Sequence, residues 1–388
     1  MFEIKTMNKI AQQGLDVLAE NGFMVNPESA NPDGMLIRSA KLHDEVFGDK
    51  LLAIGRAGAG TDNVPVDRCT KEGIAVFNAA GANAEAVKEL TLCGLFLASR
   101  DIAGGIAWAK SIAGEPDVAA AVEKGKNNFV GPELMGKTLG VIGLGAIGYR
   151  VANAAVALGM KVWGYDPYLS VDAAWRLRSE VKHAADLDTI FRECDYLTLH
   201  MAATSETKGM LNAAAIAKMK QGVRIVNFAR GALINDADML AALSAGKVAR
   251  YVTDFPNNAL IGAPGVVAIP HLGASTPESE DKCAIMAAQE LADYLKNGNT
   301  KNSVNLPNVT LDRAGAARLC VIHQNVPRTI NSFLDLIGAE NINVEHMINK
   351  ARGDVAYTII DAGSPLGSEI TEKIAAMKEV LRVRVLAD

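Results

Sequence analysis

The sequence predicts an α/β fold in which helices cover both faces of parallel sheets. Three observations support this prediction. Short, almost entirely apolar runs alternate with amphipathic stretches, a glycine-rich turn links one such run to a helix, and the C-terminus follows a separate strand–helix pattern. Strands that are apolar throughout are typical of parallel sheets with both faces buried.

The apolar runs that predict strands form two series. They occupy residues 34–38, 51–55 and 74–78 in the first series, and 138–145, 160–166, 194–200, 223–229, 248–254 and 266–271 in the second. A long helix over 84–100 ends the first series. The second begins near Lys137, after a hydrophilic segment, and a polar connector over 296–308 follows the last long helix. These breaks divide the chain into three blocks.

The third block, residues 316–388, has the order strand, helix, strand, strand, helix, strand. This split βαβ-βαβ order is typical of a ferredoxin-like domain. The block is too small to be a substrate enzyme, so we expect it to sense a ligand or to dimerise.

Composition excludes several classes of function. The chain has 388 residues, 49% of them hydrophobic, and a net charge of −5. Because a typical domain has about 150 residues, this length predicts two or three domains. The basic residues are scattered, which argues against a nucleic-acid or anionic-membrane partner. No apolar run approaches the roughly 20 residues that span a bilayer, and the N-terminus has no signal-like core. We therefore expect a cytoplasmic protein without a membrane partner.

The cysteines lie far apart in the sequence and form no Cys-x-x-Cys pair, the spacing typical of zinc and redox sites. They are Cys69, Cys93, Cys194, Cys283 and Cys320. This pattern predicts reduced thiols and no metal site.

The most specific motif is the turn Gly143-x-Gly145-x-x-Gly148, which follows an apolar strand and opens a helix that ends near Gly159. Glycines there allow a tight turn and a close approach of the backbone to a pyrophosphate, and the helix N-terminus presents free N–H groups to the anion. Asp166 ends the next strand, where a carboxylate can accept hydrogen bonds from a ribose and repel a 2′-phosphate. The motif favours NAD over NADP; the alternative is a glycine-rich turn of some other α/β fold.

Further along, polar side chains stand at successive strand ends, beside the predicted nucleotide site. Arg230 can clamp a carboxylate bidentately and polarise an adjacent carbonyl. His271 is suited to proton transfer near neutral pH. The alternatives are a surface arginine and a histidine that satisfies a backbone group. His200 has no such neighbours and is expected to be structural or to line the cofactor cleft, and Asp254 either takes part in the chemistry or only ends a strand.

Several motifs, taken in order, resemble those of the D-isomer-specific 2-hydroxyacid dehydrogenases. They are GRAGAGTDNV (55–64), NAEAVKELT (83–91), GKTLGVIGLGAIG (136–148), NFARGALIND (227–236) and PHLGAST (270–276). The resemblance covers nearly the whole chain. It implies a flavodoxin-like substrate domain from residues 1–100 and 276–305, a Rossmann-type NAD-binding domain over 101–275, and a ferredoxin-like ACT domain over 316–388.

The same resemblance assigns roles to residues. Arg230 would bind the substrate carboxylate and keto oxygen, with His271 as acid and base, while Arg56 and the backbone N–H groups of Ala57 and Gly58 would meet the anionic end of the substrate. Asp254 would lie near the nicotinamide carboxamide. Further cofactor contacts would come from Ala146, Ile147, Met201, Phe228, Ala229, Gly273 and Ala274.

One position departs from the family pattern. The family usually has a glutamate after the aspartate that matches Asp254, hydrogen-bonded to the histidine, but here the sequence continues PNNA. Either Asp254 substitutes for it, or Asn257 or Asn258 orients the ring more weakly, or the third group is absent. Because the glutamate stabilises the imidazolium, its loss predicts a lower pH optimum for keto-acid reduction than in relatives that carry it.

The resemblance is nearest to the branch that oxidises 3-phospho-D-glycerate to 3-phosphohydroxypyruvate with NAD, the first step of L-serine synthesis. Two alternatives stay open: a reductase for another small 2-keto acid such as glyoxylate or hydroxypyruvate, and a non-catalytic NAD-sensing protein. Family members pair through their nucleotide domains, so a homo-oligomer is implied.

The ACT resemblance implies an L-serine effector. Its binding positions match His323, Asn325 and Asn343, but Arg328 replaces a glycine common in that loop. The alternative is a dimerisation module that binds no ligand.

Overall fold

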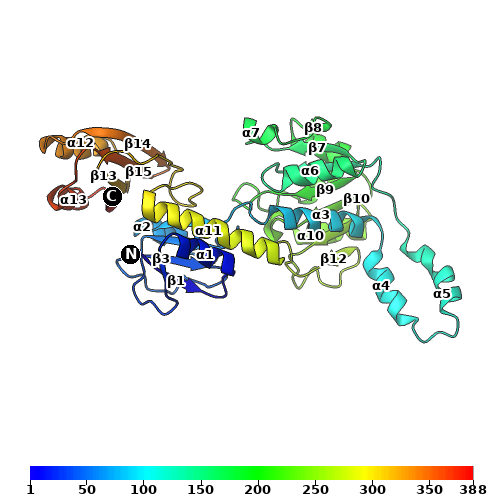
Figure 1. Cartoon of the computed structure of the whole chain (residues 1–388). Helices are drawn as coiled ribbons and strands as arrows, with labels where there is room; N and C mark the ends of the chain where they lie inside the picture. The colour runs from blue at the N-terminus through cyan, green and yellow to red at the C-terminus, as the bar shows by residue number, and fades with distance from the viewer. Residues whose placement is uncertain (388) are drawn as a thin grey trace. The chain divides into compact units, whose positions relative to one another are not determined.

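The computed structural model describes residues 1–387, which form two compact units. The first unit comprises residues 1–83 and the chain from Pro277 onward, and the second comprises Ala84–Thr276. Each unit is described separately below (Figure 1).

The first unit contains a five-stranded parallel sheet with the order β2-β1-β3-β4-β5. Its elements are β1 (Glu3–Met7), α1 (Gln12–Glu20), β2 (Met24–Val25), β3 (Gly34–Ile37), β4 (Ala53–Arg56), α2 (Val66–Lys71), β5 (Ala75–Asn78) and α11 (Pro277–Asn297). This is the flavodoxin-like strand order, so the predicted fold of this part of the chain is confirmed.

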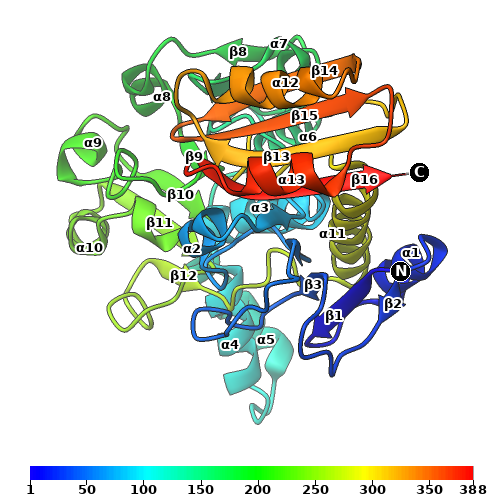
Figure 2. The ribbon, with the colours of Figure 1, turned by 90° about the vertical axis from the view of Figure 1, so that its left-hand side faces the viewer.

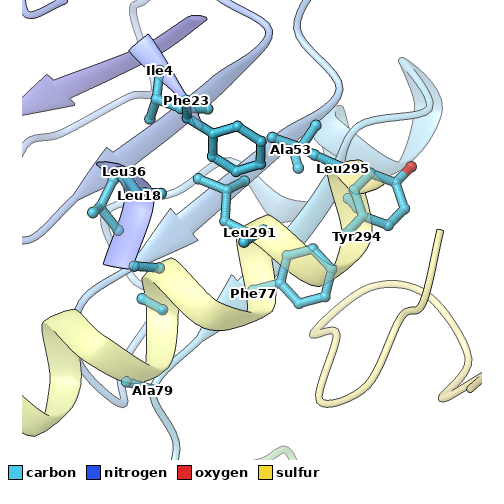
Figure 3. Close-up of a cluster of buried hydrophobic side chains, with 14 of the residues drawn as sticks. Ile4, Leu18, Phe23, Leu36, Ala53, Phe77, Ala79, Leu291, Tyr294 and Leu295 are labelled. Carbon is cyan, nitrogen blue, oxygen red and sulfur yellow. The ribbon is translucent and has the colours of Figure 1, made fainter. Parts of the chain in front are cut away.

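Helix α11 forms the centre of the core of the first unit (Figure 3). Leu291, Tyr294 and Leu295 lie at the i, i+3, i+4 spacing of one helix face and are buried against Leu36 and Phe77 of the sheet. Helix α1 lies on α11 so closely that a Cβ on Gly14 would come 2.7 Å from the Cβ of Ala284. Replacing Leu291 by Ala would therefore leave a cavity costing about 2–5 kcal/mol.

The second unit contains a seven-stranded parallel sheet with the order β12-β11-β10-β9-β6-β7-β8. Its elements are α3 (Ala84–Ser99), α4 (Ile102–Ser111), α5 (Val118–Gly125), the 3₁₀ turn η1 (Lys126–Phe129), β6 (Thr138–Ile142), α6 (Gly148–Ala157), β7 (Lys161–Tyr165), α7 (Val171–Ala174), β8 (Val181–His183), α8 (Leu187–Glu193), β9 (Tyr196–Leu199), α9 (Ala213–Ala217), β10 (Val223–Asn227), η2 (Gly231–Leu233), α10 (Asp236–Ser244), β11 (Val248–Thr253) and β12 (Val266–Ala268). Helices α3 and α6 cover one face and α8, α9 and α10 the other. The Rossmann-type prediction is confirmed.

Helix α3 belongs to the second unit, whereas the sequence boundary at residue 100 assigned it to the first. The reason is packing. Leu95 and Ala98 are buried with Val226 and Phe228 of the second unit, and a Cβ on Gly94 would come 2.8 Å from the Phe228 ring. The apolar face of α3 is therefore part of the core of the nucleotide unit.

The C-terminal part of the first unit is an antiparallel sheet with the order β14-β15-β13-β16, the ferredoxin-like arrangement predicted. Its elements are β13 (Ala317–Gln324), α12 (Thr329–Ala339), β14 (Val344–Arg352), β15 (Val355–Ala362), α13 (Ser368–Ala375) and β16 (Val380–Ala387).

The two faces of this C-terminal sheet have different partners. Leu319 and Val321 share a core with residues of α12 and α13. These two helices lie on one face of the sheet (Figure 2). Cys320 and Ile322 alternate with those two residues and join the core around α11. The C-terminal sheet is thus held to α11 by a shared apolar core.

No single helix in residues 1–387 is long and apolar enough to cross a membrane. Helices α3 and α4 satisfy that measure only when they are taken together across their 68° bend. All five cysteines are free thiols, and only Cys93 is exposed.

Candidate active site

The glycine turn of the second unit lies at the carboxyl end of β6. Gly143 has φ 89°, and a Cβ there would collide with the carbonyl oxygen of His200 at 2.5 Å. A Cβ on Gly148 would overlap the carbonyl oxygen of Gly143, whereas a Cβ on Gly145 would have no heavy atom within 4 Å. Two glycines therefore allow the turn to close, and the third leaves open space beside it.

The residues of this turn fit a dinucleotide. Helix α6 begins at Gly148 without a side-chain cap, so its first N–H groups are available to an anion. Asp166, just after β7, accepts hydrogen bonds from the N–H groups of Leu144 and Tyr168, both at 2.9 Å. These bonds hold its carboxylate beside the turn, where the remaining lone pairs can accept ribose hydroxyls.

Neighbouring strands bring the predicted reacting groups to one edge of the sheet. The strands β9, β10, β11 and β12 are adjacent in that order and parallel. Arg230 follows β10, Asp254 follows β11 and His271 lies three residues after β12. The ring of Phe255 is 4.7 Å from the His271 ring, centroid to centroid, and a Cβ on Gly231 would lie 3.2 Å from Phe255. These groups therefore form one cluster.

The backbone of the Arg230 loop is fixed by Asn227, whose Nδ2 donates to the carbonyl oxygen of Arg230 at 3.0 Å. The guanidinium donates from Nη1 to the carbonyl oxygen of Ala229 at 2.7 Å. Its other N–H groups remain available to a carboxylate or a keto oxygen.

Asp254 is a fully buried carboxyl within this cluster. Burial raises its pKa, and this effect is opposed first by the charge of His271, then by the N–H groups of Asp254 itself and Gly273, and then by Arg230. Those N–H groups face the carboxylate without reaching hydrogen-bonding geometry. The charge of His271 thus acts on Asp254, but within residues 1–387 neither carboxylate oxygen has a hydrogen-bond partner, so the imidazole is not hydrogen-bonded to Asp254.

The asparagines that follow do not orient the imidazole. Nδ2 of Asn257 donates to Asp236 at 2.7 Å, and its Oδ1 accepts the N–H groups of Ala259 and Leu260. Asn257 thus shapes its own loop, and Asn258 is exposed to solvent. Of the three explanations for the missing glutamate, this geometry disfavours the asparagines; substitution by Asp254, which makes no hydrogen bond to the ring, and the absence of a third group both stay predictions.

His200 has a different environment. Its Nε2 lies 3.0 Å from the hydroxyl of Thr198, and burial lowers its pKa to about 3. A histidine that stays neutral at physiological pH does not exchange protons there. Met201, the next residue after His200, was predicted to contact the cofactor. Phe228 is buried beneath α3, so only its backbone and that of Ala229 remain to face a cofactor.

In the first unit, the structure corrects one prediction about the substrate's anionic end. The N–H of Ala57 donates to the carbonyl oxygen of Ile37 at 2.7 Å, and the N–H of Gly58 donates to that of Arg56 at 2.8 Å. The first bond continues the pairing of β3 with β4, which is in register up to Ile37 and Arg56, and the second is a local bond within the loop after β4. They are not free donors for an anion, and Arg56 remains as the candidate.

A second arginine, which the sequence did not single out, lies at the same sheet edge. Arg38 follows β3 and forms an ion pair with Glu280 of α11 at 2.6 Å. Burial raises the pKa of the Cys283 thiol, while the charges of Arg56 and then Arg38 oppose that rise. Both guanidiniums therefore lie near one thiol. Only the pairing of β3 with β4 reveals this neighbourhood.

Comparison with known proteins identifies the family. The family model of the D-isomer specific 2-hydroxyacid dehydrogenase, NAD binding domain, matches residues 104–273. D-3-phosphoglycerate dehydrogenase from Bacillus subtilis is 34% identical over 330 residues, which cover 80% of this chain and 60% of that protein. This chain belongs to the D-isomer-specific 2-hydroxyacid dehydrogenase family. Its second unit is therefore the family's NAD-binding domain, with NAD as cofactor.

Two further members of this dehydrogenase family support the assignment. D-3-phosphoglycerate dehydrogenase 1 from Saccharomyces cerevisiae is 29% identical over 413 residues, covering 96% of this chain and 84% of that protein. The solved structure of NAD⁺-bound 3-phosphoglycerate dehydrogenase from Entamoeba histolytica aligns with a TM-score of 0.62 and 26% identity, covering 78% of this chain and 98% of that one. By contrast, the chain spans only about three fifths of the length of the Bacillus relative described above.

In the C-terminal sheet of the first unit, the predicted effector residues do not meet. His323 is buried, with Nδ1 2.9 Å from the carbonyl oxygen of Gln324 and Nε2 2.8 Å from the hydroxyl of Thr358. Asn325 lies at the end of β13 that pairs with Val355. Asn343 lies at the opposite end of the sheet, because the next residue, Val344, pairs with Ala362. One chain alone therefore does not bind one small molecule through all three residues.

Proposed function

We propose that this protein is an NAD-dependent dehydrogenase that oxidises 3-phospho-D-glycerate to 3-phosphohydroxypyruvate, the entry reaction of L-serine synthesis. The observation that supports this most is the cluster of Arg230, Asp254 and His271 at strand ends of the NAD-binding domain. The curated relatives named D-3-phosphoglycerate dehydrogenase support the choice of substrate. Its free thiols suit a cytoplasmic protein.

In the proposed reaction, Arg230 binds the substrate carboxylate through its guanidinium fork and polarises the oxygen on C2. His271 accepts the C2 hydroxyl proton while the C2 hydrogen leaves as a hydride, which NAD accepts when bound. The Asp254 carboxylate stabilises the imidazolium that forms. We assign the phosphate to Arg56 and Arg38, because guanidinium groups bind phosphate oxygens bidentately.

Steady-state assays test this proposal. We expect NADH to form from NAD and 3-phospho-D-glycerate, and NADH to be consumed with 3-phosphohydroxypyruvate. A higher kcat/KM for glyoxylate or unphosphorylated hydroxypyruvate would favour a reductase for another 2-keto acid.

Substituting His271→Asn should lower kcat about 100-fold or more while NAD still binds. A variant with full activity would sink the proposal.

We also propose that the chain forms a homo-oligomer through the arm made by α4 and α5. Neither helix contains a buried residue, and Ile102, Ile106, Val118 and Val122 are all more than a third exposed. The arm extends away from the sheet of its own unit (Figure 1). An exposed group of aliphatic side chains on a protruding hairpin is typical of an oligomer interface.

For the L-serine effector, we propose a site shared by two copies. Strand β14 is an edge strand of nine residues. Antiparallel pairing of two β14 strands about their centres would bring Asn343 of one copy near residue 353 of the other, where Asn325 donates to the carbonyl oxygen of Gly353 at 3.2 Å. Serine binding that disappears in both Asn325→Ala and Asn343→Ala supports this; binding that survives both substitutions contradicts it.

A further inference from the structure

Phe255 adjoins both loops that carry the reacting groups of the NAD-binding domain. Its ring is 4.7 Å from the His271 ring, centroid to centroid, with the two planes inclined by 53°. A Cβ on Gly231 would lie 3.2 Å from the Cβ of Phe255 and 3.7 Å from its Cγ. Gly231 follows Arg230 directly. One side chain therefore packs against the imidazole and against the loop of the guanidinium.

The backbone of Phe255 has little freedom. Its N–H donates to the hydroxyl of Thr253 at 3.1 Å, and that threonine is fully buried at the end of β11. Pro256 follows, and the residue before a proline is disfavoured from the helical conformation. The half-buried side chain of Phe255 is thus attached to a fixed strand end.

No hydrogen bond orients the imidazole in residues 1–387. The His271 ring forms none there, and both carboxylate oxygens of Asp254 lack hydrogen-bond partners. The amide of Asn257 donates to Asp236 instead. Packing must therefore limit the rotation of the ring, and the distance from Phe255 is within the range in which aromatic pairs attract each other.

We propose that Phe255 is a positioning residue, which orients the His271 imidazole relative to Arg230. Its ring limits the rotation of His271 about its side-chain bonds, so that a ring nitrogen stays directed at the C2 hydroxyl of a substrate bound by Arg230. Because Gly231 also lies against Phe255, the same side chain sets the spacing between the two loops. The effect on the reaction rate rests on the proposed function, whereas the orientation of the imidazole does not.

A small displacement of the imidazole is enough to change the rate. Proton transfer requires the nitrogen to lie within hydrogen-bonding distance of the hydroxyl, and a misplacement of about 1 Å can cost about 100-fold. Leucine at position 255 would keep an apolar side chain but lose the ring, whereas tyrosine would keep the ring. The proposed reaction assigns neither NAD nor the substrate to Phe255, so their binding should not change.

Steady-state kinetics of the full chain test the proposal. We expect Phe255→Leu to lower kcat about tenfold, while KM for NAD and for 3-phospho-D-glycerate stays within about twofold of the parent. Phe255→Tyr should keep about half of the parent kcat or more. The control Phe2→Leu, which removes a ring 5.7 Å from that of Phe23 in the first unit, should match the parent. Circular dichroism reports the folding of each variant.

A Phe255→Leu variant with the parent's kcat, or an equal loss in Phe255→Tyr, would overturn the proposal. A double substitution adds a second test. In the His271→Asn background, Phe255→Leu should leave the residual kcat unchanged, because a residue that acts through the imidazole has no further effect once the imidazole is absent. A further loss in that background would contradict a positioning role.

NMR spectra of the chain with isotope-labelled histidine need no turnover. The signal of His271, identified by its absence from His271→Asn, should be displaced by the ring current of Phe255. Phe255→Leu should abolish this displacement and Phe255→Tyr should keep it. A chain that shows this pattern without dehydrogenase activity refutes the proposed function alone, whereas a His271 signal that Phe255→Leu does not move refutes the orientation of the imidazole by Phe255.

Discussion

At the scale of single residues, the proposed chemistry depends on the electrostatic effect between Asp254 and His271. We expect Asp254→Asn to lower kcat about 10- to 100-fold, because the imidazolium loses its carboxylate. For the same reason, the rate of keto-acid reduction, which requires a protonated imidazole, should begin to fall at a lower pH than in the parent. Rate profiles in both directions check this, with Asp188→Asn on α8 as control. A variant with an unchanged profile would assign Asp254 to cofactor contact alone.

The stability of the same variant should change in the opposite direction from its activity. Burial raises the pKa of Asp254, so its ionised form destabilises the folded chain, increasingly as the pH rises above the ordinary value of 3.8. Asparagine removes that buried charge. Urea denaturation at pH 7 should therefore show a variant at least as stable as the parent.

Arg38 gives a sharper test of substrate choice. We expect Arg38→Gln to raise the KM for the phosphorylated substrate about tenfold and to leave unphosphorylated hydroxypyruvate nearly unaffected, since only the phosphate loses a guanidinium. Glu280→Gln breaks the same ion pair but keeps the guanidinium. If both variants raise KM equally, the effect comes from the lost ion pair and Arg38 does not contact phosphate.

Residue positions could be predicted where they depend on strand ends. Arg230 and Asp254 follow apolar runs directly, and parallel strands bring their carboxyl ends to one edge. The position of Arg38 beside Arg56 and the partner of the Ala57 N–H could not be predicted, because both depend on the pairing of β3 with β4. Separation of Asn343 from Asn325 likewise follows from sheet register.

At the scale of elements, α11 carries a titratable group that the proposed reaction does not use. Glu290 is buried, accepts a hydrogen bond from Asn302 at 2.8 Å through Oε1, and leaves Oε2 without a partner. Burial raises its pKa from 4.5 to about 7, against the opposing effects of Asn302 and Lys301. The neutral form is favoured in the folded state, so this residue's contribution to stability is complete below pH 4.5 and is lost as the pH rises toward 7.

We therefore expect the Glu290→Gln variant and the parent to have equal free energies of unfolding at pH 4.5. At pH 8 the variant should be about 1–2 kcal/mol more stable. Glutamine keeps the acceptor for Asn302 and removes the ionisable proton. Urea denaturation at both pH values measures this, with the exposed Glu20→Gln on α1 as control. Equal stabilisation at both pH values would instead point to packing.

The ends of several helices and strands differ from those that the sequence predicts, or were not predicted at all. The apolar run 138–145 extends beyond β6, which ends at Ile142, because Gly143 adopts a left-handed conformation that stops the strand. The helix expected over 84–100 is found as Ala84–Ser99. The helices α4 and α5 were not predicted, and neither buries a residue in its own unit.

At the scale of the whole molecule, alternating strands and helices were enough to predict parallel sheets, and the family resemblance supplied their two strand orders. Patterns alone do not give the order of strands in a sheet, because apolar runs of similar composition fit any position. The allocation of α3 to the NAD-binding domain also required coordinates, since its apolar face would suit either core.

The arm leads to a prediction about assembly. We expect the parent chain to be an oligomer and Ile106→Asp to shift it toward the monomer, because a carboxylate in an apolar interface loses its hydration. Ile106 is 54% exposed within its own chain, so the substitution should not unfold it. Val171→Asp, at a side chain 74% exposed on α7, is the matched control. Light scattering after gel filtration measures the mass, and a parent chain that runs as a monomer, or an Ile106→Asp variant with unchanged mass, would remove the arm from the interface.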